Sequence, residues 1–261
     1  MGIVILLLVV FLAALGPSIS GHSYTETHLE KVNQAPSANF WLGTDDLGRD
    51  VFTRLCVGAR ISIFIGVMAA LIDMIIGSLW GGTAALLGGW IDAVMMRICD
   101  LLYSLPYLLI VILLMMVLGK GIIPILVAMC CLGWITMARI VRLQLLQLKQ
   151  RSFVLAAKGM GAGFFRILFC HLLPNAVAPI LVTMTMTIPA AMFVEAFLSF
   201  LGLGVQAPLP SWGSMVSEGL PTAAYYPWRF FSPALVMIMT ILAFHFVADA
   251  LKSKEGVWES C

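Results

Sequence analysis

The sequence RSFVLAAKGMGAGFFRILFCHLLP (Arg151 to Pro174) interrupts a strongly apolar chain with a basic, glycine-containing segment. It has three basic side chains, one histidine, no acid, and three glycines within five positions. FVLAAKGM favours a short helix, and the glycines after it allow the backbone to turn. FFRILFCHLLP resumes an apolar helix, which Pro174 should interrupt. The pattern predicts a helix–turn–helix along a membrane face. Its role is open between an interfacial connector and a docking element.

The composition indicates a membrane protein. The chain has 261 residues, of which 61% are hydrophobic and only 11% charged. A soluble domain is about a quarter charged, so lipid must cover most of this surface. The net charge of +2 does not indicate a nucleic-acid partner. The six cysteines lack metal-ligand spacing, and we interpret them as core residues rather than a metal site. They are Cys56, Cys99, Cys130, Cys131, Cys170 and Cys261.

Six apolar segments are long enough to span a bilayer, which needs about 20 residues in a helix. They lie at roughly 2–20, 61–87, 101–118, 122–142, 177–201 and 231–251. The first has small residues near a plausible signal-peptide cleavage point, and almost nothing precedes it. It lacks a basic start and is long, so we expect a retained span. The sequence therefore predicts an all-α, six-span membrane protein.

Basic residues predict the orientation. The segment at about 139–176, between spans four and five, is basic and has no acid, whereas charges between spans one and two are mixed. Cytoplasmic loops carry excess Lys and Arg, so this segment and both termini should be cytoplasmic. The basic residues assigned to that side are Arg97, Arg139, Arg142, Lys149, Arg151, Lys158, Arg166, Lys252 and Lys254.

The opening segment resembles the EAA loop of ABC importer permeases, the coupling helix that sits in a groove of the ATPase subunit. Ala156, Ala157, Gly161, Leu173 and Pro174 keep that spacing. The family's Glu position is occupied by Leu155, which removes a polar contact without changing the expected loop shape. His171 lies within the same segment.

Two more stretches are similar to one subfamily. LGTDDLGRDVFTRLCVGARIS (Leu42 to Ser62) looks like the signature of the C-type permease subunit of oligopeptide, dipeptide and nickel importers. EAFLSFLGLGVQAPLPSWGSM (Glu195 to Met215) looks like the same subfamily's outer loop. The first contains the external motif, whose residues are Gly43, Thr44, Asp45, Asp46, Gly48, Arg49 and Asp50.

The resemblance implies half of a translocation path in a bacterial cytoplasmic (inner) membrane. The implied partners are a homologous B-type permease subunit, two ABC ATPases and an extracytoplasmic substrate-binding protein. ATP and magnesium would be bound by the ATPases, with no cofactor in this chain. The implied substrate is a dipeptide or oligopeptide, or alternatively nickel or a metal chelate. We divide the chain into 1–60 (first span and external segment), 61–251 (transport core) and 252–261 (cytoplasmic tail).

The external motif has a structural and a functional interpretation. Asp45 and Asp46 are suited to cap a helix, and Arg49 can pair with a nearby acid. A structured turn and a contact with the binding protein both remain open. In the second stretch, Trp212 is expected at the membrane interface, as is Trp228 further on.

Two acids within the spans are candidate site residues, because a carboxylate in lipid is costly. Asp73 lies in the second span and Glu195 in the outer half of the fifth. Each either lines the translocation path or pairs helices. We favour the path for Asp73 and leave Glu195 open.

Other function classes lack their motifs. No Gly-x-x-x-x-Gly-Lys-Ser/Thr loop is present, so the chain is not expected to hydrolyse ATP. An intramembrane protease would need a paired-Asp or Ser/His constellation, and an ion channel a selectivity filter. We recognise neither in the sequence.

Overall fold

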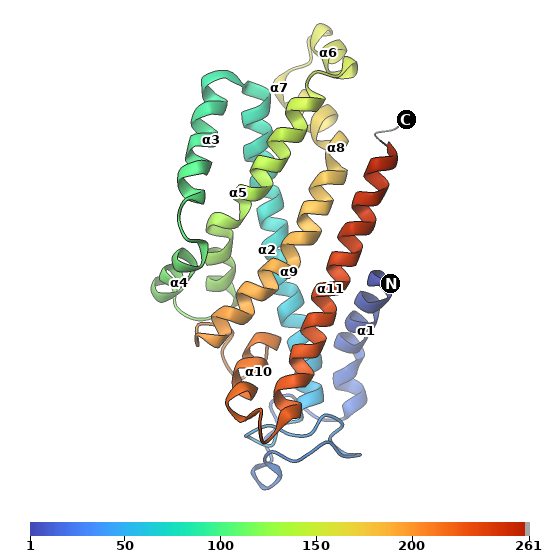
Figure 1. Cartoon of the computed structure of the whole chain (residues 1–261), viewed down its shortest axis with the longest axis vertical. Helices are drawn as coiled ribbons and strands as arrows, with labels where there is room; N and C mark the ends of the chain where they lie inside the picture. The colour runs from blue at the N-terminus through green and yellow to red at the C-terminus, as the bar shows by residue number, and fades with distance from the viewer. Residues whose placement is uncertain (259–261) are drawn as a thin grey trace.

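A computed structural model describes residues 1–258 of the chain, and this part is built of helices joined by loops, with no strand (Figure 1). Five helices are long and apolar enough to cross a membrane. They are α1 (Gly2–Ser20), α2 (Val51–Leu87), α5 (Ile122–Leu148), α9 (Val177–Phe200) and α11 (Pro227–Trp258). A bent helix pair brings the number to six if it counts as one span. The predicted all-α membrane fold is confirmed.

The third span is not the single helix expected at 101–118. It consists of α3 (Gly89–Tyr103) and α4 (Tyr107–Leu118), which meet at an angle of 80°. Pro106 precedes α4 and has no N–H to continue the hydrogen-bond ladder, and it disfavours helical backbone at Leu105. The bend therefore follows from Pro106.

The second span starts earlier than expected, at Val51 rather than 61. Asp50 caps it, because its carboxylate accepts hydrogen bonds from the Thr53 N–H at 2.9 Å and the Thr53 hydroxyl at 2.5 Å. The cap is thus Asp50, not Asp45 or Asp46 as predicted. The boundary drawn at residue 60 falls inside this helix.

The long helices run side by side, with α2 at the centre (Figure 1). The α2 helix packs mainly against α5 and α9, and α1 lies beside α2 and α11. At one end lies the segment 149–176, hereafter the α5–α9 connector (Figure 1). At the other end, hereafter the cap, are the 21–50 segment and α10 (Trp212–Gly219). The remaining short helices are η1 (Leu29–Lys31), α6 (Ser152–Gly159), α7 (Phe164–Arg166), η2 (Ile167–Leu172), α8 (Leu173–Asn175) and η3 (Leu220–Thr222).

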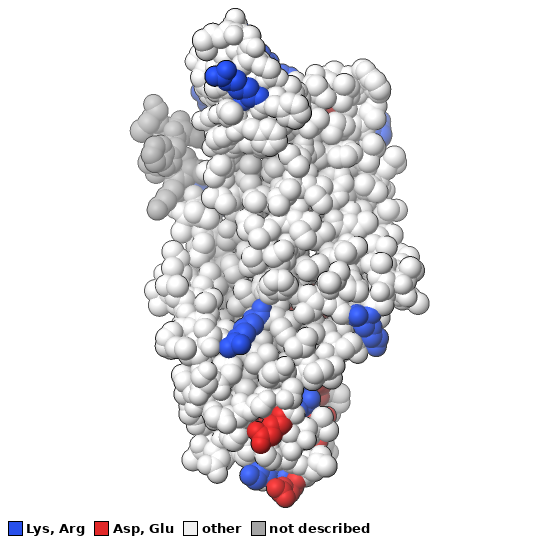
Figure 2. All heavy atoms as spheres, turned by 180° about the vertical axis from the view of Figure 1, so that it is seen from behind, with Lys and Arg blue, Asp and Glu red and all other residues white. Residues whose placement is uncertain are grey.

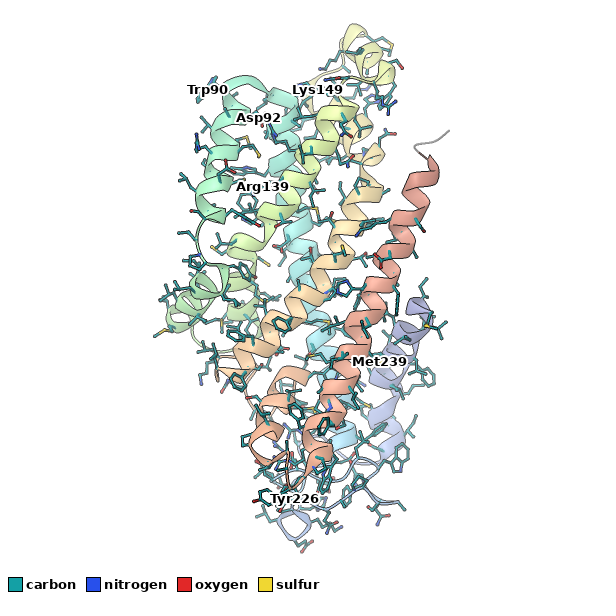
Figure 3. The ribbon with its side chains drawn as sticks, in the orientation of Figure 1. Trp90, Asp92, Arg139, Lys149, Tyr226 and Met239 are labelled. Atoms are coloured by element: carbon teal, nitrogen blue, oxygen red, sulfur yellow. The ribbon has the colours of Figure 1, made fainter. Side chains whose placement is uncertain are left out.

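Charge is concentrated towards the two ends. On the face drawn in Figure 2, most of the middle is uncharged, and acidic side chains gather near the cap. Asp92, Arg139 and Lys149 lie in the half of the molecule that bears the connector (Figure 3). An uncharged middle is what a lipid-spanning surface requires.

The cysteines are distributed as core and surface residues. Cys56, Cys99 and Cys130 are buried, whereas Cys131 and Cys170 are exposed. Cys261 and the side chain of Lys254 lie outside the described part of the chain.

Candidate functional site

The first arm of the connector is a helix that ends in a glycine turn. α6 ends at Gly159, and Gly161 then takes a φ of +81°, which glycine adopts without strain. The turn is closed by a hydrogen bond from the Ala162 N–H to the Ala157 carbonyl at 3.0 Å. A β-carbon at Gly161 would meet no atom within 4 Å, so the backbone angle alone demands glycine. This is the chain reversal that the sequence predicts.

The second arm stays helical through α7, η2 and α8, with η2 in π-helical geometry. Pro174 was expected to break this helix. It lies instead at the start of α8, where its missing N–H is tolerated, and the break comes at Ala176. Pro174 is exposed, Leu173 is half-buried, and the His171 carbonyl accepts a hydrogen bond from the Asn175 amide at 2.6 Å.

The two alanines of the EAA-like motif point in different directions. Ala156 is exposed, as is Leu155, whose exposed fraction is 56%. Ala157 is only 2% exposed, and Val154, one helical turn away, is fully buried. Ala157 therefore belongs to the inner face of α6, and Ala156 to its outward face. Since α6 must bury one face on its own loop, residues three apart turn inward.

Polar contacts fasten the connector end to the bundle. The Lys149 ammonium donates to the carbonyls of Ala85 and Leu86, each at 2.9 Å, and so satisfies the last turn of α2. Arg142 holds Asp92 of α3 through two contacts of 2.5 Å. Basic side chains thus cap and pair the helices that flank the connector.

A cavity of about 810 Å³ is lined by residues of α2, α3, α4, α5, α9 and α11. Most of the lining is apolar. Its polar members include Asp73, Tyr107, Thr183, Thr187 and Lys252. Asp73 is the only acid, and Lys252 the only base, among the described residues that line it.

Asp73 is deeply buried in the wall of this cavity, with an exposed fraction of 4%. Its Oδ1 atom has no hydrogen-bond partner within the described part of the chain. Gly133 of α5 faces the carboxylate so closely that an added β-carbon would lie 2.3 Å from Oδ2. The glycine therefore makes the room in which the carboxylate lies.

Glu195 is fully buried but does not line the cavity. One carboxylate oxygen accepts from the Ser211 hydroxyl at 2.7 Å and the Ser199 hydroxyl at 2.9 Å, and the other from the Ser62 hydroxyl at 3.3 Å. These donors come from the start of α10, from α9 and from α2. The geometry therefore favours helix pairing over a path-lining position.

Ser211 and Ser62 also form hydrogen bonds at the start of α10. Ser211 and Ser214 form a reciprocal capping box, and the Trp212 N–H donates to the Ser62 hydroxyl at 3.0 Å. The Trp212 indole is fully buried and donates to the Leu55 carbonyl at 3.0 Å. The indole is therefore enclosed by the protein and does not anchor the chain by contact with lipid. Trp228 is half-buried, and its indole donates to the Thr44 carbonyl at 3.3 Å.

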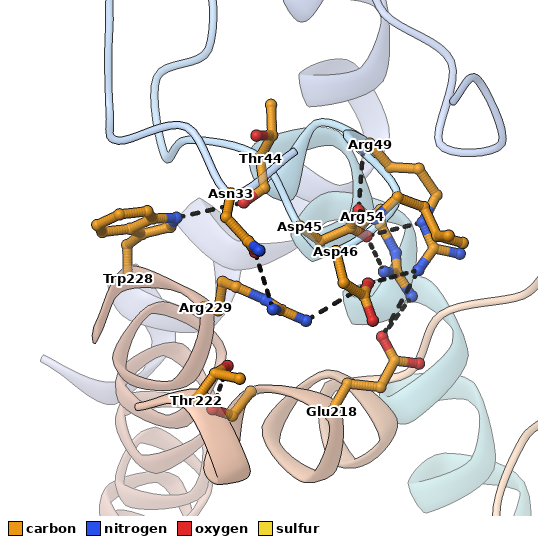
Figure 4. A network of polar contacts seen from close by, with 12 residues as sticks. Asn33, Thr44, Asp45, Asp46, Arg49, Arg54, Glu218, Thr222, Trp228 and Arg229 are labelled. Atoms are coloured by element: carbon orange, nitrogen blue, oxygen red, sulfur yellow. Dashed lines mark hydrogen bonds and ion pairs between the residues drawn. The ribbon is translucent and has the colours of Figure 1, made fainter. Parts of the chain in front are cut away.

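The external motif folds around Asp45 (Figure 4). Its carboxylate accepts from the backbone N–H groups of Leu47 and Arg49, each at 2.9 Å. Arg49 also pairs with it at 2.7 Å, as expected, and Arg54 forms a second ion pair. Burial acts to raise the pKa of Asp45, but the two guanidinium groups and backbone donors outweigh it and lower the pKa.

The network extends across the cap to α10 and α11 (Figure 4). Glu218 of α10 lies 3.1 Å from Arg54. Arg229 of α11 is buried, donates to the Asn33 side chain at 2.9 Å, and lies 3.4 Å from Asp46. The motif thus ties the 21–50 segment to three helices.

Both glycines of the motif are required by their surroundings. Gly43 and Gly48 have φ values of +74° and +71°. A β-carbon at Gly48 would lie 2.0 Å from the His28 carbonyl oxygen. Thr44 is fully buried and its hydroxyl donates to the Lys31 carbonyl at 2.5 Å. These contacts make the motif a structured turn.

Some residues of these sites were not predicted. Ser211 and Ser214 have the three-residue spacing of a capping box, a signal that was available in the sequence. Gly133 interrupts an apolar span, and a glycine there costs helix stability unless packing requires it. The partners of Glu218 and Arg229 lie more than 160 residues away in the chain, and no local pattern identifies them.

The chain matches a family described as "Binding-protein-dependent transport system inner membrane component" over residues 62–255. It is 53% identical to the oligopeptide transport system permease protein OppC of Bacillus subtilis, over 96% of this chain and 82% of that protein. It is 54% identical to the dipeptide transport system permease protein DppC of the same species, over 96% and 79%.

Two further comparisons are more distant. The glutathione transport system permease protein GsiD of Pectobacterium atrosepticum is 39% identical over 85% of this chain and 74% of its own length. A solved inward-facing structure of the MetNI methionine ABC transporter matches with a TM-score of 0.64 at 16% identity. It covers 77% of this chain and 95% of the matched chain, and it shows similarity of fold alone.

Proposed function

The chain belongs to the family of binding-protein-dependent transport system inner membrane components, and from this premise we propose that it is the C-type permease subunit of an ATP-driven peptide importer. The relatives named above are permease proteins for oligopeptides, dipeptides and glutathione. Their names favour a peptide over nickel or a metal chelate as substrate. Family membership also sets aside the ion-channel and intramembrane-enzyme alternatives.

The cavity forms this chain's half of the translocation path in the proposal. It lies in the bundle next to α9, and its largely apolar wall includes several polar side chains. A homologous B-type subunit would supply the other half. A substrate-binding protein would deliver the peptide at the cap, where Asp46 is 55% exposed and Glu218 is 39% exposed.

The connector would couple this chain to two ABC ATPase subunits. Leu155 and Ala156 give α6 an exposed, uncharged face, while Val154 and Ala157 are buried on its other face. A flat exposed face on a fastened helix suits insertion into a groove of a partner. ATP and magnesium would be bound, and ATP hydrolysed, by those partners rather than by this chain.

The orientation in the proposal puts the connector and both termini in the cytoplasm of a bacterium, with the cap outside the inner membrane. A membrane-impermeant maleimide applied to intact cells tests this. The probe should label a Gln34→Cys variant and leave a Gln150→Cys variant unlabelled, with Cys131 and Cys170 replaced by serine. Both glutamines are exposed. Labelling of the Gln150→Cys thiol from outside would overturn the orientation.

The exposed Ala156 carries the coupling proposal and gives its test. Ala156→Trp should leave the membrane fold intact, because the side chain has room outward, but should block ATPase docking. Co-purification of the ATPase subunits with the tagged chain measures this, alongside peptide uptake. Ala224→Trp is the matched control, since Ala224 is exposed at the opposite end. If both variants retain the ATPases and transport equally, the connector is not the coupling element.

A further inference from the structure

Three hydroxyl groups of the cavity wall already donate their hydrogens within the protein. The Thr183 hydroxyl donates to the Pro179 carbonyl at 2.8 Å, and the Thr187 hydroxyl to the Thr183 carbonyl at 3.0 Å. The Tyr107 hydroxyl donates to the Met129 carbonyl at 3.3 Å. Each oxygen retains acceptor capacity, so these positions offer a ligand acceptors rather than donors.

Asp73 supplies a further acceptor, and a buried carboxylate oxygen without a hydrogen-bond partner is the most costly of these groups. Its Oδ1 atom is buried and unpartnered, in a side chain more than nine-tenths buried. A buried carboxylate without a donor is costly, and a charged donor is the partner that compensates it best. Gly133 makes the room in which the carboxylate lies, and both residues line the cavity.

The one base in the lining does not fill this role in the described structure. Lys252 is 47% exposed, and its ammonium lies 4.0 Å from Asp249. The ion pairs of the connector end likewise involve other acids, Asp92 and Asp100. The carboxylate of Asp73 is therefore available to a group that enters the cavity.

We propose that Asp73, in the space made by Gly133, binds an ammonium group of the substrate as it passes through the cavity. An ammonium has three donors and no acceptor, which matches the Asp73 carboxylate and the three hydroxyl oxygens whose hydrogens are already used. In a peptide this group is the protonated amino end or a lysine side chain. The inference rests on the proposed function for the identity of the substrate.

The first experiment measures ammonium recognition without transport. In the assembled importer, with Cys131 and Cys170 changed to serine, Thr187→Cys places a thiol on the cavity wall. The rate of its modification by aminoethyl methanethiosulfonate, which is cationic, is divided by the rate with the neutral hydroxyethyl reagent. Adding Asp73→Asn should lower this ratio by about fivefold or more, because the attraction of a nearby carboxylate is lost.

The controls separate the carboxylate from general effects. Glu195→Gln removes an acid that does not line the cavity, and it should leave the ratio unchanged. Gly133→Ala should lower the ratio as Asp73→Asn does, because the added methyl displaces the carboxylate. An unchanged ratio in Asp73→Asn would overturn the inference whatever Gly133→Ala does.

The second experiment identifies the source of the ammonium group. Uptake of trialanine and of N-acetyl-trialanine is measured in proteoliposomes, each at a concentration that saturates the binding protein. Asp73→Asn should lower the ratio of free to acetylated uptake by about tenfold, the loss of one charged hydrogen bond. An equal loss for both peptides, or dissociation of the permease pair, would mean that Asp73 serves the partner subunit, and it would overturn the inference. Absence of uptake of either peptide by the unmodified importer would instead contradict the proposed function, while the thiol measurement stays valid.

Discussion

One carboxylate is buried next to the cap and another in the cavity wall, and the two differ in their hydrogen-bond partners. Glu195, on α9 next to the cap, accepts hydrogen bonds from three serines on separate elements. Asp73, on the cavity wall, has an oxygen with no partner in the described part of the chain. Burial therefore does not distinguish a structural acid from one reserved for a ligand. The hydrogen-bond donors around the carboxylate distinguish the two.

The same contrast holds for the two ends of the bundle. At the cap, Asp45, Arg49 and Arg54 pair with one another inside the chain. At the connector, Leu155 and Ala156 face outward. One end satisfies its charged groups within the chain, and the other leaves uncharged side chains exposed. The following predictions test this division.

The largest effect is expected at the centre of the cap. Asp45→Ala removes the acid shared by two buried arginines and should destabilise the fold by about 3 kcal/mol. Thermal unfolding of the detergent-solubilised chain measures the loss. Asp46→Ala is the matched control, because Asp46 is 55% exposed and should change stability by less than about 1 kcal/mol. Equal losses would mean that the Asp45 network does not hold the cap.

The pH dependence of Asp45 has a definite sign. Its folded-state pKa is lowered, so the stability it contributes is present above the unfolded carboxyl's pKa of about 4. That contribution is lost as the pH falls through the lower folded-state pKa. The difference in unfolding temperature between wild type and Asp45→Ala should therefore be constant from pH 7 to about 5 and shrink below about 4. A difference that instead shrinks above about pH 5 would contradict the assignment.

A smaller loss is expected at Glu195. Glu195→Ala leaves the hydroxyls of Ser62, Ser199 and Ser211 without their shared acceptor, which should cost about 2 kcal/mol. Unfolding temperature and the yield of assembled complex are the measurements. Transport should fall in proportion to the intact complex that remains. Normal assembly with abolished transport would place Glu195 in the path and break the comparison.

A substitution in the glycine turn of the connector should cost less stability. Gly161→Ala forces a β-carbon into a left-handed backbone angle and should cost about 1 kcal/mol of local stability. Amide hydrogen exchange of α6 reports it, with weaker ATPase binding as the functional result. Gly159→Ala is the control, because Gly159 lies in α6 and alanine favours the helix. Faster exchange in the control than in Gly161→Ala would contradict the turn geometry.

The smallest effect on stability is expected at Asp73. Asp73→Asn removes a charge that has no partner on one oxygen, so the folded state should change by less than about 1 kcal/mol. Thermal unfolding beside Glu195→Ala makes the comparison direct. A loss as large as that of Glu195→Ala would show that Asp73 holds the helices together.

The sequence was sufficient for the family, the all-α membrane fold and the turn at Gly161, because apolar length and glycine are local signals. The bend before Pro106 is also a local signal, because proline disfavours helical backbone at the residue before it. The direction of Ala157 depends on which face of α6 the loop buries. The different surroundings of Asp73 and Glu195 could not be predicted from the sequence, because Ser62 and Ser211 contact Glu195 only after the helices pack.

The serine contacts of Glu195 have a consequence for how α9 can move. They fix one end of this helix to α2 and α10, while its other end continues into the connector. Among the described residues, the connector end of α9 is held to other helices by apolar packing alone, so the helix rotates about its hydrogen-bonded end more readily than it slides. Pro189, within the helix, adds a point of compliance near that hydrogen-bonded end. A force on the connector would therefore rotate α9 about the end held next to the cap, and this rotation would widen or narrow the cavity.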